Sequence, residues 1–219
     1  MERVAVGVLV SGAGTNLRAL LDASQAQSYP ARVALVISNR RSAGALDVAR
    51  DQGVEAIALP VGDFGGDLAA RDAAIRDALQ HAGVRLVVCA GYDRVLTAAV
   101  LDAYPDAILN VHPSLLPAFA GGMRAVEDAL AFGAKVSGCT VQLLEPGVPD
   151  GGPVVLQAAV PVHEDDDADS LRMRIHEQEW RILPEAVALW SGGRLRRDGR
   201  TVRILSPDLQ PTSGGRPIP

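Results

Sequence analysis

The sequence predicts an α/β protein with a doubly wound, mostly parallel, Rossmann-like sheet. Short and uniformly apolar runs, such as residues 4–10, are typical of central parallel strands that are covered on both faces. Each run is followed by a segment with helical periodicity, and the two alternate at the spacing of parallel sheets. The composition, with 48% hydrophobic and 21% charged residues, is that of a globular protein.

The first half of the chain contains the alternating strands and helices. Gly53 and Gly83 each follow a helical segment, where glycine commonly ends a helix. Pro113 prevents the last of these strands from running on, because proline lacks the N–H that a strand donates. Strands are expected at residues 4–10, 33–37, 56–59, 86–90 and 107–110, and helices at 17–23, 43–52, 68–82 and 96–103.

The pattern changes after Pro117. A loop and a helix are followed by two apolar strands, a long helix with a stripe of buried residues, and a small hairpin that turns at Asp198-Gly199. We expect one domain over residues 1–204 and a mobile tail over 205–219, which is rich in Pro, Gly and Ser. The expected elements are a loop at 118–122, helices at 124–132 and 169–190, strands at 137–144 and 154–160, and the hairpin at 194–204.

Composition also narrows the class of function. The net charge of −5 argues against a nucleic-acid partner, which usually requires a basic face. No apolar run approaches the roughly 20 residues that span a bilayer, and residues 1–4 lead directly into a strand without a signal-peptide pattern. The four His and two Cys show no metal-ligand spacing. We therefore expect a cytoplasmic protein without a metal, as a monomer or homodimer, that acts on small molecules and contacts neither membrane nor nucleic acid.

A glycine-rich turn, Ser11-Gly12-Ala13-Gly14-Thr15-Asn16, joins the first strand to the first helix. Backbone N–H groups and the helix dipole at such a turn form an anion site, so Gly14, Thr15 and Asn16 can hold a phosphate. The turn does not match the GxGxxG pattern of dinucleotide binders. A tight turn without any ligand would explain the same glycines.

Asn110 and His112 form the second candidate site. Residues two apart on a strand point to the same face, so both side chains can face one pocket at the carboxyl end of the sheet. His112 can move protons at neutral pH, and the amide of Asn110 can donate a hydrogen bond to a developing oxyanion. The alternative is structural, with a histidine that caps a loop and an asparagine that closes a turn.

Asp150 is the third candidate, in Pro149-Asp150-Gly151-Gly152-Pro153. A carboxylate beside an imidazole orients it and stabilises its charged form. The alternative is an ordinary Asp-Gly turn between two strands. Together, Asn110, His112 and Asp150 suit transfer of an acyl group through a negatively charged tetrahedral intermediate.

Five motifs extend this hypothesis, and together they resemble the phosphoribosylglycinamide (GAR) formyltransferases of purine synthesis. The resemblance covers roughly residues 3–195 and implies the formyltransferase fold and formyl transfer from 10-formyltetrahydrofolate to the amine of GAR. The motifs are SGAGTNL (11–17), ISNR (37–40), AGYDRVL (90–96), NVHPSLLP (110–117) and DGGPVVLQ (150–157).

The resemblance also implies roles for individual residues. Asn110, His112 and Asp150 match the catalytic triad of the family. The matching GAR-binding residues are Gly14, Thr15, Asn16 and Glu179, and the matching folate-binding residues are Arg71, Ala90, Gly91, Tyr92, Arg94, Val95, Leu96 and Asn110.

Several positions depart from the family pattern. Gln142 stands where the family often has histidine, and Asp93 replaces a residue that is usually apolar. The loop after Pro117 lacks the usual histidine, and this loop and the one before Asp150 each look one residue longer. These departures concern the folate side of the site and leave the triad intact.

Two alternatives to GAR formylation remain on the sequence. One is a 10-formyltetrahydrofolate deformylase, although that enzyme usually carries a regulatory domain before the catalytic sheet. The other is a non-catalytic binder of folate or nucleotide, and the altered loops are the reason why this alternative remains. Methionyl-tRNA formyltransferase would require a further domain and a basic face, which this acidic chain does not offer.

Overall fold

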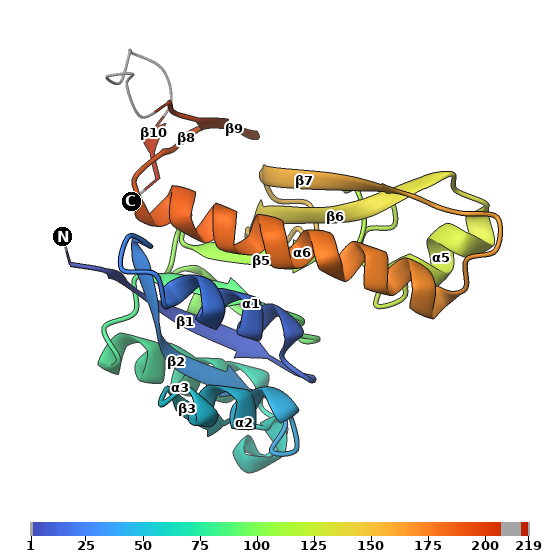
Figure 1. Cartoon of the computed structure of the whole chain (residues 1–219). Coiled ribbons are helices and arrows are strands. Elements are labelled where there is room, and N and C mark those ends of the chain that lie inside the picture. The colour runs from blue at the N-terminus through green and yellow to red at the C-terminus, as the bar shows by residue number, and fades with distance from the viewer. Residues whose placement is uncertain (1, 207–215, 219) are drawn as a thin grey trace.

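The computed structural model describes residues 2–206 and 216–218 and contains a single mixed sheet, in the order β10-β8-β9-β7-β6-β5-β4-β1-β2-β3. The predicted α/β class with a largely parallel sheet is confirmed (Figure 1). The strands are β1 (Val4–Val10), β2 (Ala31–Ser38), β3 (Glu55–Ala58), β4 (Leu86–Cys89), β5 (Ile108–His112), β6 (Val136–Leu143), β7 (Val154–Pro161), β8 (Leu195–Asp198), β9 (Thr201–Ile204) and β10 (Arg216–Pro217).

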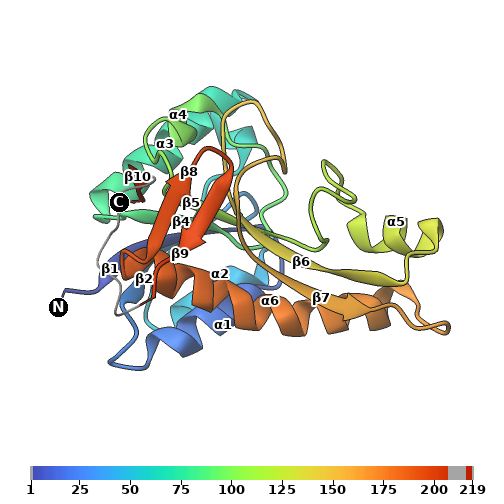
Figure 2. The same ribbon diagram turned by 90° about the horizontal axis from the view of Figure 1, so that it is seen from above.

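The helices cover both faces of the parallel part of the sheet. Viewed from above, α1, α2 and α6 lie on one face, and α3 and α4 lie on the other (Figure 2). The helices are α1 (Thr15–Ser24), α2 (Gly44–Asp51), α3 (Leu68–His81), α4 (Ala98–Leu101), α5 (Ala125–Phe132) and α6 (Ala168–Ser191), with a short 3₁₀ helix, η1 (Val61–Phe64).

The first five strands are parallel to one another, and the register of the β1–β2 pair shifts once, between Val6 and Gly7. β1 and β4 are buried along their whole length, as their uniformly apolar sequences predicted. The helix expected at 96–103 is shorter, because the backbone of Thr97 is extended and α4 begins only at Ala98 and ends at Leu101. The 3₁₀ helix was not expected.

The sheet changes direction after β5. β5 pairs antiparallel with β6, and β6 pairs antiparallel with β7, so the predicted two-strand unit that carries Asp150 is confirmed. The long helix α6 packs along β6 and β7 and reaches back to α1 (Figure 1). Its predicted apolar stripe, Leu171, Ile175 and Ile182, is buried in the core.

The C-terminal hairpin, β8 and β9, extends the sheet beyond β7. Its turn is formed by Gly199 and Arg200, one residue later than the expected Asp198-Gly199, because Asp198 ends β8 and pairs with Thr201. The mobile tail predicted over residues 205–219 falls largely outside the described residues. Within the described part, Arg216–Pro217 form β10, which pairs with β8, and Ile218 is buried.

Gly14 is a position where the fold depends on glycine. Its φ of +86° lies in the left-handed region, where it begins α1, and a Cβ there would lie 2.8 Å from Cα of Ala45. A Cβ on Gly12, two residues earlier, would have no neighbour within 4 Å. The start of α1 therefore lies against α2 at Gly14.

We expect Gly14→Ala to lower the free energy of unfolding by at least about 1–2 kcal/mol, because the new methyl group is strained and meets the backbone of Ala45. Gly12→Ala is the matched control and should retain wild-type stability. Urea denaturation of both variants measures the difference. Equal stability of the two variants would contradict the close approach at Gly14.

Candidate functional site

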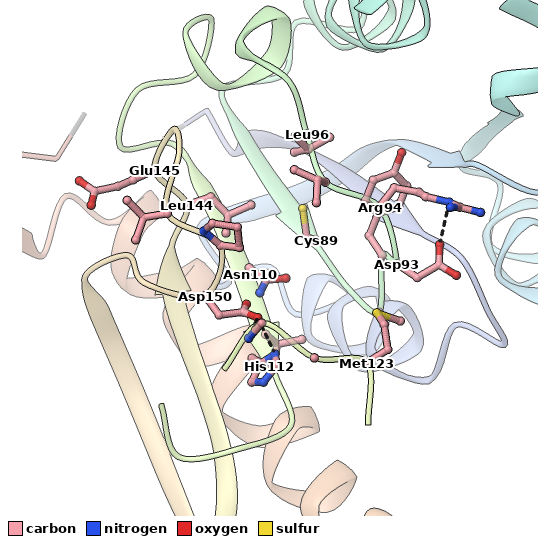
Figure 3. A pocket seen from close by; sticks show the side chains of 18 of the residues that line it. Cys89, Asp93, Arg94, Leu96, Asn110, His112, Met123, Leu144, Glu145 and Asp150 are labelled. Carbon is pink, nitrogen blue, oxygen red and sulfur yellow. Dashed lines mark hydrogen bonds and ion pairs between the residues drawn. The ribbon is translucent and has the colours of Figure 1, made fainter. Parts of the chain in front are cut away.

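A cavity of about 500 Å³ opens at the carboxyl ends of β4 and β5. Cavities of this size, mostly apolar and with a few polar groups, are typical of small-molecule sites, and this edge is where open α/β sheets bind their ligands. Its walls come from the segment after β4, from β5 and the loop that follows it, and from the loop between β6 and β7 (Figure 3). The lining residues include Gly91 to Leu96, Asn110, His112, Gly121 to Met123, Leu144, Glu145 and Gly147 to Asp150.

Asn110 and His112 both lie on β5 and both line the cavity. The strand runs two residues further than predicted and ends at His112, directly before Pro113. His112 is buried, and its Nε2 lies 3.2 Å from the carbonyl oxygen of Phe119. Its Nδ1 lies 3.5 Å from Oδ2 of Asp150. Each ring nitrogen thus faces an oxygen acceptor, so the ring can carry a proton on both sides.

Asp150 is fixed from three directions. Besides His112, its Oδ2 accepts a hydrogen bond from the backbone N of Gly121 at 2.9 Å, and its Oδ1 accepts one from Nε2 of Gln142 at 3.1 Å. Its backbone has a φ of +50°, which is uncommon for a residue other than glycine and is often found at functional sites. Asn110, His112 and Asp150 therefore come together at the cavity, as Figure 3 shows.

Gln142 is a site residue that sequence reasoning noted only as a departure. It lies opposite Asn110 in the β5–β6 pair and is fully buried. Its amide donates to Asp150, and its Oε1 accepts from the backbone N of Gly152 at 3.1 Å. A Cβ on Gly152 would lie 1.7 Å from the carbonyl oxygen of Leu143, so glycine is required there. Gln142 thus both donates to Asp150 and holds the turn after it.

The loop that follows β5 is held by hydrogen bonds from β6 and β7. The hydroxyl of Thr140 donates to the carbonyl oxygen of Ser114 at 2.7 Å and accepts from the backbone N of Leu116 at 3.0 Å. The amide of Gln157 donates to Thr140 and to the carbonyl oxygen of Leu116. Because Thr140 pairs with His112 across the strands, this network fixes the chain on the carboxyl side of the histidine.

The predicted folate-binding residues divide into two groups. Gly91, Tyr92, Arg94, Val95 and Leu96 line the cavity together with Asn110. Ala90 and Arg71 do not belong to the lining; Arg71 is fully buried, donates to Oδ1 of Asp72 and reaches the carbonyl oxygen of Val95 at 3.4 Å. Asp72 in turn accepts from the backbone N of Thr97 at 2.6 Å. In the described structure, therefore, Arg71 lies behind the cavity wall and contacts its backbone at Val95.

Asp93 connects the cavity to the glycine-rich turn. Its carboxylate accepts hydrogen bonds from Ser11 Oγ at 2.9 Å and Asn39 Nδ2 at 2.8 Å, and it forms an ion pair with Arg40. Burial opposes the ionisation of Asp93, but these hydrogen bonds and the charges of Arg40 and Arg94 outweigh it and lower its pKa. The departure at Asp93 thus joins the ends of β1, β2 and β4.

The predicted GAR-binding residues meet on the other side of this turn. Asn16 Nδ2 donates to Oε2 of Glu179 on α6 at 2.8 Å, and both side chains are buried. Oδ1 of Asn16 has no hydrogen-bond partner among the described residues. Burial raises the pKa of Glu179 to about 7, although the Asn16 hydrogen bond opposes the rise. Gly14 and Thr15 present the start of α1 beside this pair.

Other chemistry is not indicated by the described residues. No group of three His, Cys, Asp or Glu side chains within them could hold a metal ion. None of the described helices is long and apolar enough to cross a membrane. Cys89 and Cys139 are buried free thiols, as expected, and burial raises the pKa of each to about 12.

The motifs, the fold and the cavity can be compared with known proteins. A model of the family described as formyl transferase matches residues 3–187. The chain belongs to the formyl transferase family. The resemblance inferred from the five motifs is therefore confirmed.

Relatives of the family share both sequence and structure with this chain. A phosphoribosylglycinamide formyltransferase of Haemophilus influenzae is 38% identical, over 87% of this chain and 89% of its own length. The crystal structure of glycinamide ribonucleotide transformylase 1 from Symbiobacterium toebii is 48% identical, with a TM-score of 0.90, over 93% of this chain and 95% of its own. The trifunctional purine biosynthetic protein adenosine-3 of Drosophila melanogaster is 41% identical over 95% of this chain, which spans 15% of that protein's length.

We expect Gln142→Leu to lower turnover by up to about a hundredfold, because a small displacement of Asp150 is amplified at the reacting groups. The buried N–H of Gly152 also loses its acceptor, which should cost roughly 1–3 kcal/mol of stability. Steady-state kinetics below the unfolding temperature separates the two effects. Wild-type turnover in a folded Gln142→Leu variant would show that Asp150 does not depend on Gln142.

The raised pKa of Glu179 predicts that the stability of the protein depends on pH. Its pKa is about 7 in the folded protein and about 4.5 without burial, so the folded state binds this proton more tightly. The associated stability is complete below pH 4.5 and is lost as pH rises to 7, by an amount of the order of 3 kcal/mol. We expect the Tm of Glu179→Gln to exceed that of wild type at pH 8 and the gap to close towards pH 5.

Nε2 of His176 lies 3.9 Å from Oε2 of Glu179, and burial lowers the pKa of His176, so the comparison is repeated in a His176→Gln background. Thermal unfolding of the two proteins across this pH range makes the measurement. A gap that does not change with pH would contradict the raised pKa of Glu179.

Proposed function

We propose that this chain transfers a formyl group from 10-formyltetrahydrofolate to the amine of GAR, which gives phosphoribosyl-N-formylglycinamide and tetrahydrofolate in purine biosynthesis. The observation that carries the proposal is the meeting of Asn110, His112 and Asp150 at one cavity, beside a turn suited to phosphate. Membership of the formyl transferase family and the printed names of its relatives support the same activity.

The donor fits the cavity by size and polarity. A volume of about 500 Å³ suits a flat bicyclic ring, and apolar side chains such as Leu96, Leu101 and Leu144 line it. Asn110 and His112 add polar groups to this lining. We assign the pterin to the space between residues 91–96 and 144–150.

The acceptor is assigned to the glycine-rich turn. The ribose phosphate would bind the backbone N–H groups at the start of α1, where the helix dipole favours an anion. Glu179 and Asn16, which are joined by a hydrogen bond beside this turn, would contact the remainder of GAR. Because Asp93 joins the turn to the cavity wall, the two substrates would lie next to each other.

The residues then have separate roles in the transfer. The amine nitrogen of GAR attacks the formyl carbon, and the carbonyl electrons move to its oxygen. The Asn110 amide donates to this oxyanion, a contact often worth a few kcal/mol. His112 relays the proton that the amine loses to N10 of the folate as the C–N10 bond breaks, and Asp150 stabilises the charged imidazole. Holding both substrates in line adds several kcal/mol.

The experiment is a formyl-transfer assay with purified protein, GAR and 10-formyltetrahydrofolate or its dideaza analogue, in which absorbance follows the folate product. Product that forms only when GAR is present is the expected result. Folate product without GAR would instead indicate a deformylase. Bound ligands without any product would indicate a non-catalytic binder.

We expect His112→Ala to lose most of its turnover, because proton transfer by a positioned side chain typically contributes about 10²–10⁴-fold. GAR binding should persist, since the turn at residues 14–16 is separate from the imidazole. Turnover and calorimetric GAR affinity measure the two effects. Near-normal turnover of this variant would rule out the assigned role of His112.

A further inference from the structure

The loop between β6 and β7, residues 144–153, forms one wall of the cavity and contains neither helix nor strand. It carries Asp150, and Leu144 and Glu145 also line the cavity. Its backbone closes on itself where Gly151 N donates to the carbonyl oxygen of Val148 at 3.1 Å. A loop of this kind requires contacts from outside to keep a defined position.

Arg197, on β8, holds the beginning of this loop. Its guanidinium forms ion pairs with Glu145 and with Asp106, and its side chain is 20% exposed. Asp106 lies immediately before β5, and its carbonyl oxygen accepts from Nε1 of Trp190 at 2.8 Å. Arg197 therefore joins the cavity loop to the rigid base of the strand that carries the candidate catalytic residues.

Arg200, at the turn of the same hairpin, holds the end of the loop. Its Nη1 donates to the carbonyl oxygen of Gly151 at 2.7 Å. The next residue, Thr201, pairs with Val154 at the start of β7, which fixes the hairpin beside the loop. In Figure 2 the loop between β6 and β7 arches beside the turn that joins β8 and β9.

From these contacts we propose that the β8–β9 hairpin is a positioning element for the folate side of the site. Arg197 and Arg200 bracket the loop at residues 145 and 151, and neither lines the cavity. The hairpin lies beyond residue 187, where the match to the family model ends.

The support is selective for one substrate. The hairpin contacts the wall assigned to the folate, whereas the GAR side is built by the glycine-rich turn and Glu179 on α6. Loss of the hairpin contacts should therefore weaken the binding of the formyl donor and leave the binding of GAR unchanged. This selectivity rests on the proposed function, but the contact of the hairpin with the loop does not.

The experiment compares Arg200→Met and Arg197→Met with wild type. Arg200 is exposed and makes a single contact with the loop, so its variant should fold normally. Arg197→Met leaves Glu145 without this partner and Asp106 with Arg216 alone, and it serves as the second, more severe variant. Arg203→Met is the matched control, because Arg203 lies on the same hairpin and is exposed.

Two readouts are measured for each protein. In the formyl-transfer assay, the KM for the donor should rise roughly three- to tenfold, the change that corresponds to one lost hydrogen bond, while the KM for GAR stays constant. Hydrogen exchange in the free protein should become faster at the amides of Gly147, Val148 and residues 150–152. Arg203→Met should match wild type in both readouts.

Unchanged exchange and unchanged donor KM in both arginine variants would overturn the proposal. A parallel rise in the KM for GAR, or the same effects in Arg203→Met, would also overturn it. If wild type forms no product from GAR, the proposed function fails, and the exchange of residues 146–152 alone decides whether the hairpin positions the loop.

Discussion

The antiparallel pairing of β5 with β6 is the constraint on which the site depends. The parallel strands before it bring Asn110 and His112 to the carboxyl edge of the sheet, but they supply no carboxylate. Because β6 runs back along β5, Gln142 lies opposite Asn110, and the chain then returns to the same edge through the loop that carries Asp150. The register of one strand pair thus brings an amide, an imidazole and a carboxylate to one cavity.

Three acidic residues around the site differ in environment. Polar and cationic neighbours lower the pKa of Asp93, and the hydrogen bond that it accepts from Ser11 joins the glycine-rich turn to the cavity wall. Glu179 is buried beside Asn16 with a raised pKa, so it is close to half protonated near neutral pH. Asp150 faces His112 and is held by neutral donors. A carboxyl group thus supports the structure at Asp93, is assigned to the binding of GAR at Glu179, and is assigned to the stabilisation of the imidazole at Asp150.

The sequence predicted the parts of the fold that depend on local pattern. The five parallel strands, the long helix and the C-terminal hairpin follow from apolar runs, helical periodicity and turn residues. The motifs also identified Asn110, His112 and Asp150, which meet at the cavity. The contacts between distant segments could not be predicted, because no local pattern encodes them: Asn16 and Glu179 are 163 residues apart, and Arg197 lies 52 residues from Glu145. For the same reason, Gln142 and Asp93 were visible only as departures from a family, without their partners.

The most direct test of the account is the structure of a ternary complex with GAR and a folate analogue that has no transferable formyl group. The account predicts the phosphate on the turn at residues 14–16 and the pterin between residues 91–96 and 144–150. The amine of GAR would then lie between Asn110 and His112, with Asp150 beside the imidazole. A pterin bound outside this cavity, or a phosphate held away from the start of α1, would contradict the assignment of the two substrates and the mechanism built on it.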